Sequence, residues 1–183
     1  IQDETPLYAY GETQYSVLRY AAMAAKWKEP ARDALDTLVL GAADIGSLDL
    51  IVEQIDFMPF DPTVKRTEST LQEKATGKQF RTTKGAPHII SALINNEAVR
   101  SAVTQDVAML GNRGIRALAV ARTDDLGEWV MLGLLTFLDP PRMDTLKTIA
   151  DARAYGVCVK MVTGDQILSA KETARRLDMS DDI

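Results

Sequence analysis

The chain has 183 residues, of which 46% are hydrophobic and 26% are charged, and its net charge is −5. This composition is that of a globular protein, and the length allows one large domain or one domain with part of another. The negative charge argues against sequence-independent binding to nucleic acid. One cysteine and one histidine argue against disulfides and against a zinc site. The longest uncharged apolar run, residues 129–138, is too short to cross a bilayer, so we expect the chain itself to be soluble.

Hydrophobic periodicity predicts the elements of the first three quarters of the chain. In chain order they are an extended start at 1–10, helices at 12–28 and 31–40, a helical turn or loop at 44–50, strands at 51–58, 66–71 and 78–83, helices at 87–93 and 97–110, and strands at 115–122 and 128–136. The second helix is expected to bury Leu35, Leu38 and Val39. Adjacent hairpins, with turns at 73–77 and 124–127, predict an antiparallel sheet with helices packed on one side.

The pattern changes at Pro140 and Pro141. The elements predicted beyond them are a helix, a strand and a second helix, at 144–155, 157–162 and 167–177. A continuous apolar strand between helices is typical of a buried parallel strand in a doubly wound α/β sheet. We therefore expect two units, an α+β domain at 1–135 and part of an α/β domain at 136–183.

A strand-to-helix corner at residues 83–87 is the first candidate site. Lys84 stands at the predicted strand end, and Gly85 has no Cβ, so a ligand could approach the backbone closely there. Pro87 is well placed as the first residue of the next helix. An open helix N-terminus beside a lysine suits an anion. An ordinary turn with a solvated lysine is the plainer alternative.

Four side chains of the first unit have chemistry that suits a nucleotide. The ring of Phe60 could stack on a base, and the cations of Lys65, Lys84 and Arg116 could hold a polyphosphate. The alternative for Phe60 is an ordinary core aromatic residue. The usual glycine-rich ATP loop and the dinucleotide fingerprint are both absent.

The end of the predicted parallel strand is a third candidate. Thr163, Gly164 and Asp165 offer a hydroxyl, a close approach to the backbone, and a carboxylate that could serve Mg²⁺. In an open α/β sheet, ligands bind at the carboxyl ends of the strands, which is where these residues would lie. Simple N-capping of the next helix by Asp165 explains the same pattern equally well.

Four motifs in a fixed order resemble those of the P-type ATPases, the ion pumps that pass through an aspartyl-phosphate. They lie at residues 57–67, 84–87, 139–142 and 161–166. Their wording, together with residues 113–121 and 171–177, is similar to that of the plasma-membrane proton pumps. The similarity extends from about residue 21 to the end of the chain.

The resemblance implies a nucleotide-binding domain of α+β type, with an antiparallel sheet flanked by helices, followed by a partial phosphorylation domain of the α/β haloacid-dehalogenase type. The residues that it places around ATP are Phe60, Lys65, Lys84, Gly85, Arg116, Glu29, Asp139 and Arg142. Phe60 would stack on adenine and Arg116 would reach the phosphates. Glu29, by a looser match, would face adenine, and Asp139 and Arg142 would lie at the hinge between domains.

The resemblance also implies that Thr163, Gly164 and Asp165 surround the transferring phosphoryl group and its Mg²⁺. The segment that carries the phosphorylated aspartate and the later Mg²⁺-binding loop are both absent, so most Mg²⁺ ligands are expected outside this chain and no metal ligands are assigned within it. His88 follows the Lys-Gly-Ala-Pro motif where an acidic residue is usual. The first residue is not Met, so we expect a piece of a longer protein.

We therefore expect an ATP-binding piece of a P-type proton-transporting ATPase, at the cytoplasmic face of the plasma membrane. Its partners would be ATP and the transmembrane, actuator and remaining phosphorylation parts of the same pump. Alone, it would lack the nucleophile and would not be a competent enzyme. The alternatives are a pump for another cation, a non-catalytic nucleotide-binding module, and a free-standing phosphatase, which would need a nucleophilic Asp-x-Asp that the chain lacks.

Overall fold

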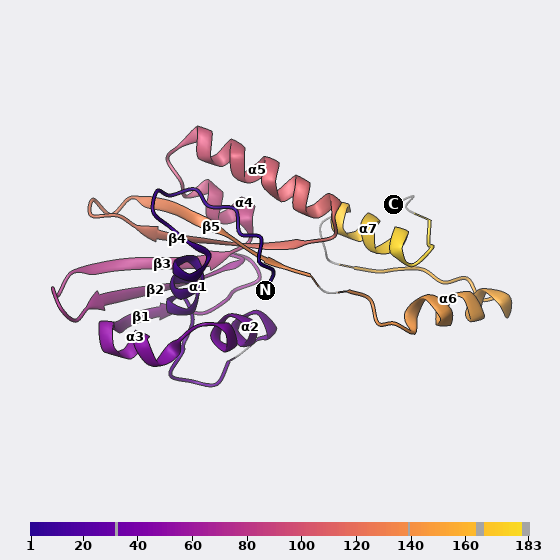
Figure 1. Cartoon of the computed structure of the whole chain (residues 1–183), viewed down its shortest axis with the longest axis horizontal. Coiled ribbons are helices and arrows are strands. Elements are labelled where there is room, and N and C mark those ends of the chain that lie inside the picture. The colour runs from indigo at the N-terminus through magenta and orange to yellow at the C-terminus, as the bar shows by residue number, and fades with distance from the viewer. Residues whose placement is uncertain (32, 139, 164–166, 181–183) are drawn as a thin grey trace.

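The structure is a computed structural model that describes residues 1–31, 33–138, 140–163 and 167–180. Its centre is one antiparallel sheet of five strands in the order β1-β2-β3-β4-β5 (Figure 1). The strands are β1 (Val52–Met58), β2 (Arg66–Glu73), β3 (Gln79–Gly85), β4 (Arg116–Thr123) and β5 (Trp129–Phe137). All five predicted strands and the antiparallel pairing are thereby confirmed, and every strand pairs with its neighbours in the sequence, including β3 and β4, which α4 and α5 separate along the chain.

The extended start of the chain continues the sheet beyond β5. The Gln2 amide donates to the Thr136 carbonyl at 2.8 Å, and the Tyr8 amide donates to the Leu132 carbonyl at 3.0 Å. Gly133 on β5 lies opposite this segment, and a Cβ added to Gly133 would lie 2.7 Å from the Pro6 carbonyl oxygen. The missing side chain of Gly133 thus lets the N-terminal segment cover the edge of β5.

Helices cover both faces of the sheet, whereas the sequence predicted helices on one side. Figure 1 shows α1 (Gln14–Met23), α2 (Ala34–Ala42) and α3 (Ile45–Ile51) on one face and α4 (Pro87–Ala92) and α5 (Glu97–Asn112) on the other. The reason lies in β4, whose side chains alternate between two cores. Leu118 and Val120 pack with α1, and Ala119 and Ala121 pack with α4 and α5. A strand that is apolar on both faces requires cover on both.

The inward face of α2 also differs from the prediction. Leu35 and Leu38 are 42% and 47% exposed, while Val39 is buried as expected. The side chain that takes the inward position is Asp36, which is 6% exposed. Apolar periodicity alone therefore predicted the wrong inward face of α2. Asp36 faces inward because its charged partner, Lys84, lies on β3.

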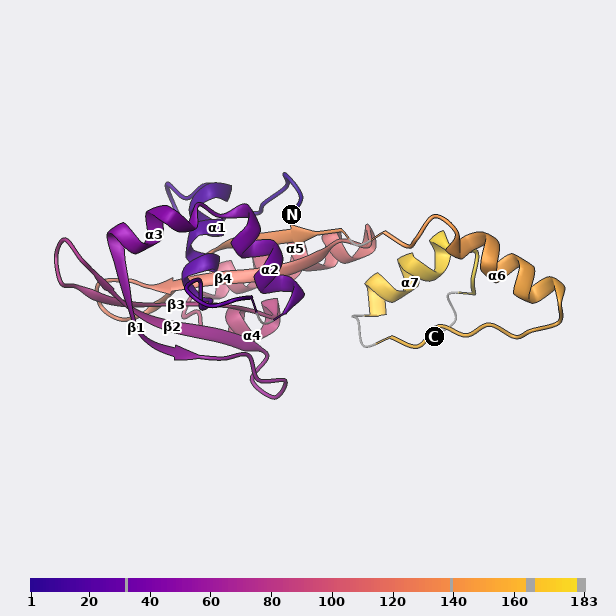
Figure 2. The same ribbon diagram turned by 90° about the horizontal axis from the view of Figure 1, so that it is seen from below.

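The C-terminal part contains two helices and no described strand. The helices α6 (Thr145–Ala154) and α7 (Ile167–Arg176) confirm those predicted from the sequence, but the parallel strand expected at 157–162 is wrong. Val157 and Val162 are 54% and 96% exposed. A β-strand requires backbone hydrogen bonds to a neighbouring strand. This segment follows α6 beyond the end of the sheet, and no described strand runs beside it (Figure 2). The boundary at residue 135 and the haloacid-dehalogenase type of this part stay predictions.

The helix α7 packs against α5 and the turn that follows it. The Arg176 guanidinium donates to the Arg113 carbonyl at 2.7 Å, and a Cβ on Gly114 would lie 2.9 Å from Glu172 Cγ. Glu172 accepts hydrogen bonds from Arg175 at 2.8 Å and from Arg176 at 2.9 Å. No helix among the residues described is long and apolar enough to cross a membrane.

The two arginines make this part of the fold sensitive to acid. Their guanidinium groups lower the pKa of Glu172 from 4.5 to about 2. A carboxyl whose pKa is lowered by folding contributes stability above pH 4.5, and the contribution is lost as the pH falls toward 2. We expect the difference in melting temperature between wild type and Glu172→Gln to shrink over that interval.

The control for this prediction is Glu97→Gln on α5, whose side chain is 80% exposed beside one arginine. It should change the melting temperature little at any pH, because exposed ion pairs contribute little. If the difference in melting temperature between wild type and Glu172→Gln stayed constant from pH 5 to pH 2.5, the proposed link between the ionisation of Glu172 and stability would be contradicted.

Candidate functional site

A cavity of about 530 Å³ opens where the end of β3 and the start of β4 meet the first turns of α2 and α4. Its size lies within the range of sites for small organic ligands, roughly 300–1,000 Å³. Five residues singled out from the sequence line it: Phe60, Lys65, Lys84, Gly85 and Arg116. They come from three separate segments of the chain, the loop between β1 and β2, the end of β3 and the start of β4, so the cavity exists only in the folded protein.

The aromatic ring at this cavity belongs to the loop between β1 and β2. Phe60 is 53% exposed, so the alternative of an ordinary core aromatic residue is wrong. The adjacent turn is held by Asp61, whose carboxylate accepts from the Thr63 amide at 2.6 Å and whose carbonyl accepts from the Lys65 amide, also at 2.6 Å. A half-exposed ring at the wall of a cavity can stack on a flat ligand.

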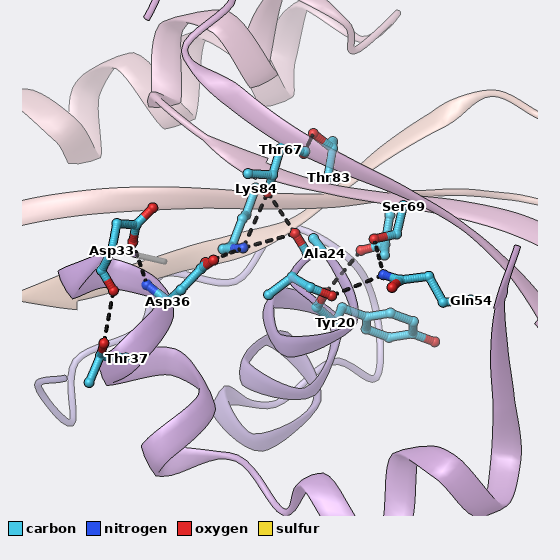
Figure 3. Close-up of polar contacts among 12 residues, drawn as sticks. Tyr20, Ala24, Asp33, Asp36, Thr37, Gln54, Thr67, Ser69, Thr83 and Lys84 are labelled. Carbon is cyan, nitrogen blue, oxygen red and sulfur yellow. Dashed lines mark hydrogen bonds and ion pairs between the residues drawn. The ribbon is translucent and has the colours of Figure 1, made fainter. Parts of the chain in front are cut away.

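Lys84 lies at the inner wall of the cavity and is only 3% exposed. Figure 3 shows its side chain beside those of Asp36 and Thr67 and the Ala24 carbonyl. Its ammonium group lies 2.8 Å from Asp36 Oδ1 and donates to the Ala24 carbonyl at 2.8 Å and to Thr67 Oγ1 at 3.2 Å. Burial lowers the pKa of Lys84, and the Asp36 carboxylate opposes that shift. The alternative of a solvated lysine at a turn is wrong for this position.

The partners of Lys84 follow from the sheet register and the end of a helix. Thr67 on β2 is the register partner of Lys84 on β3, so both side chains point to the same face. The Ala24 carbonyl belongs to the residue that ends α1, and it also accepts from Thr67 Oγ1 at 2.6 Å. Carbonyls at a helix C-terminus lack helical partners and carry partial negative charge, which favours a cation.

Gly85 is required by a close approach of the chain itself. It is the register partner of Arg66, and a Cβ on Gly85 would lie 2.5 Å from the Lys65 carbonyl oxygen and 2.6 Å from Arg66 Cβ. The sequence suggested that the missing side chain makes room for a ligand. In the structure the crowding atoms belong to the neighbouring strand and its preceding turn.

Three of the other predicted residues lie outside this cavity. Glu29 forms an exposed ion pair with Lys26 at 2.9 Å, and Arg142 lies 3.8 Å from Asp144. Thr163 borders a different cavity, between the 157–163 segment and α7. The remaining three, Asp139, Gly164 and Asp165, lie outside the residues that the structure describes.

Sequence reasoning missed several residues of the cavity wall. Asp33 and Asp36 come from the first turn of α2, Thr67 from β2 and Ser169 from α7. The available signal was the spacing of three between the two aspartates, which places them on one side of a helix start. Asp33 is the N-cap of α2 and accepts from the Asp36 amide at 2.7 Å. Two acidic groups thus line the cavity, those of Asp33 and Asp36, and Glu29 is not among its lining residues.

The charges of the cavity favour an anion with a base or ring attached. Three basic side chains, of Lys65, Lys84 and Arg116, outnumber the two carboxylates of Asp33 and Asp36. The described residues contain no group of three acidic, histidine or cysteine side chains that could hold a metal ion. The arrangement can therefore bind and orient a ligand with a flat ring and negative charge.

The five-stranded sheet with its flanking helices defines an α+β domain, and the cavity lies at one end of that sheet. Over its whole length the chain is 50% identical to two proteins of Leishmania donovani, "Probable proton ATPase 1A" and "Probable proton ATPase 1B", and it spans 19% of the length of each. The chain also matches the "Plasma membrane ATPase" of Dunaliella bioculata with 44% identity over 128 residues. That match covers 67% of the chain and 11% of the length of the relative. No protein-family model matches the chain. The resemblance to the plasma-membrane proton pumps is thereby confirmed: the chain is related over its full length to one segment of proton ATPases.

The crowding at Gly85 predicts a stability effect. Gly85→Ala should lower the free energy of unfolding by roughly 1–3 kcal/mol, because the added methyl group meets backbone that cannot move freely. The measurement is urea denaturation. Gly41→Ala in α2 is the control: no atom lies within 4 Å of its added Cβ, and it should be neutral or stabilising by up to about 1 kcal/mol. Equal losses in the two variants would contradict the account.

The burial of Lys84 predicts a larger effect at its counterion. Asp36→Ala leaves an ammonium group buried without its carboxylate and should cost about 3–5 kcal/mol at neutral pH. Asp33→Ala, at the exposed N-cap of the same helix, should cost only about 0.5–2 kcal/mol. Urea unfolding of both variants measures the difference, and a smaller loss for Asp36→Ala than for Asp33→Ala would overturn the assignment.

Proposed function

We propose that the chain is the nucleotide-binding segment of a P-type proton-transporting ATPase and positions ATP for transfer of its γ-phosphate to an aspartate outside this chain. The observation that carries the proposal is the cavity itself. It gathers an aromatic ring and three basic side chains from motifs that resemble those of these pumps. The relatives named above, which are proton or plasma-membrane ATPases, support the same reading.

In this proposal the adenine ring stacks on Phe60 at the rim of the cavity, and Lys65 and Arg116 attract the phosphates. Asp33, a hydrogen-bond acceptor in the same wall, takes the place expected for Glu29 and faces the amino group of adenine. Phosphoryl transfer depends mainly on positioning and on charge neutralisation. The contribution of this segment is therefore to hold ATP in a fixed orientation, and hinge closure would bring the γ-phosphate to the aspartate.

The C-terminal part fits the same proposal as a piece of the phosphorylation domain. Residues 136–183 would complete a sheet of haloacid-dehalogenase type only together with other parts of the pump. Asp139 and Arg142 would lie at the hinge, and Thr163, Gly164 and Asp165 would lie near the transferring phosphoryl group. Mg²⁺ would accompany ATP, with most of its ligands outside this chain. The whole pump would act in the plasma membrane, with this segment on its cytoplasmic face.

The test is a calorimetric titration of the 183-residue chain with ATP. We expect saturable binding that weakens by about tenfold or more in Phe60→Ala, since one base-stacking ring contributes roughly 1–3 kcal/mol. The control is Tyr155→Ala, which removes an aromatic ring that is 87% exposed at the end of α6, away from the cavity. Absence of ATP binding to the wild type, or equal affinity in wild type and Phe60→Ala, would overturn the proposal.

A further inference from the structure

The ammonium group of Lys84 is held inside the protein by three oxygen atoms. It donates hydrogen bonds to the Ala24 carbonyl and to Thr67 Oγ1, and it forms an ion pair with Asp36 Oδ1 (Figure 3). A phosphate at this nitrogen would compete with these partners. It would also have to approach the Asp36 carboxylate, which lies 2.8 Å from the same nitrogen. Like charges at such a separation repel strongly in a buried site.

The counterion of Lys84 is attached to a part of the cavity wall. Asp36 lies in the first turn of α2, and its amide donates to Asp33 Oδ1 at 2.7 Å. A chain of contacts thus runs from Lys84 on β3 through Asp36 to Asp33, and Asp33 and Leu35 line the cavity. The position of this wall relative to β3 therefore depends on the ion pair.

We propose that Asp36 is a positioning residue of the cavity. By binding the Lys84 ammonium it fixes the first turn of α2, with Asp33, against β3, and Lys84 itself makes no contact with the phosphates of the ligand. The phosphates are left to Lys65 and Arg116, at the outer part of the cavity. This inference rests on the proposed nucleotide function and assigns to Asp36 a role in ligand affinity.

The ligand series adenosine, AMP, ADP and ATP separates positioning from phosphate contact. If Lys84 acts through Asp36, Lys84→Met should weaken binding of all four ligands by the same factor, about tenfold. Asp36→Asn, which keeps the shape of the side chain, should give the same uniform loss. Arg116→Gln is the matched control, and its loss should grow with the number of phosphates, because it removes a phosphate contact.

The double variant Lys84→Met/Asp36→Asn guards against loss of folding, because removing both charges leaves no buried ion without a partner. We expect it to bind the ligands no more weakly than either single variant, since both act through one contact. Losses that grow from adenosine to ATP in Lys84→Met, or losses that add in the double variant, would overturn the inference while leaving nucleotide binding intact. A wild type that binds none of the four ligands would overturn the proposed function itself.

Discussion

The buried ammonium of Lys84 is the interaction on which the rest of the domain depends. Removing a charge from water is costly unless it is paired and hydrogen-bonded, so the fold must bring its partners to it. The partners come from three elements: the Ala24 carbonyl from the end of α1, Thr67 from β2 and Asp36 from α2. One side chain thereby joins the sheet to two helices at the inner wall of the cavity.

The end of β3 and the loop after β1 explain why the cavity is closed on one side and open on the other. Gly85 lets the Lys65–Arg66 segment come within contact distance of β3, which closes the sheet side of the site. The loop that follows β1 then leaves Phe60 half exposed above it. Close packing on one side and an exposed ring on the other give a site that can hold a flat, charged ligand.

The relation to proton ATPases and the geometry of the cavity both support the proposed nucleotide site. The identity of 50% extends over the whole chain, including the C-terminal part whose apolar 157–162 segment is exposed. The cavity lies in the five-stranded part and draws Ser169 of α7 into its wall. Ser169 therefore brings the C-terminal part into contact with the five-stranded part at this cavity.

The sequence by itself determined the local elements and much of the site. Periodicity predicted the five strands and the helices, and side-chain chemistry and the motifs singled out five of the residues that line the cavity, among them Phe60 and Lys65. Cover on both faces of the sheet, the absence of a strand at 157–162, and the inward turn of Asp36 were decided only by the tertiary structure. The physical reason is that periodicity reports the preference of one segment, whereas strand pairing and charge pairing require a partner distant in the sequence. For Asp36 that partner is the buried Lys84, and no apolar pattern in α2 could reveal it.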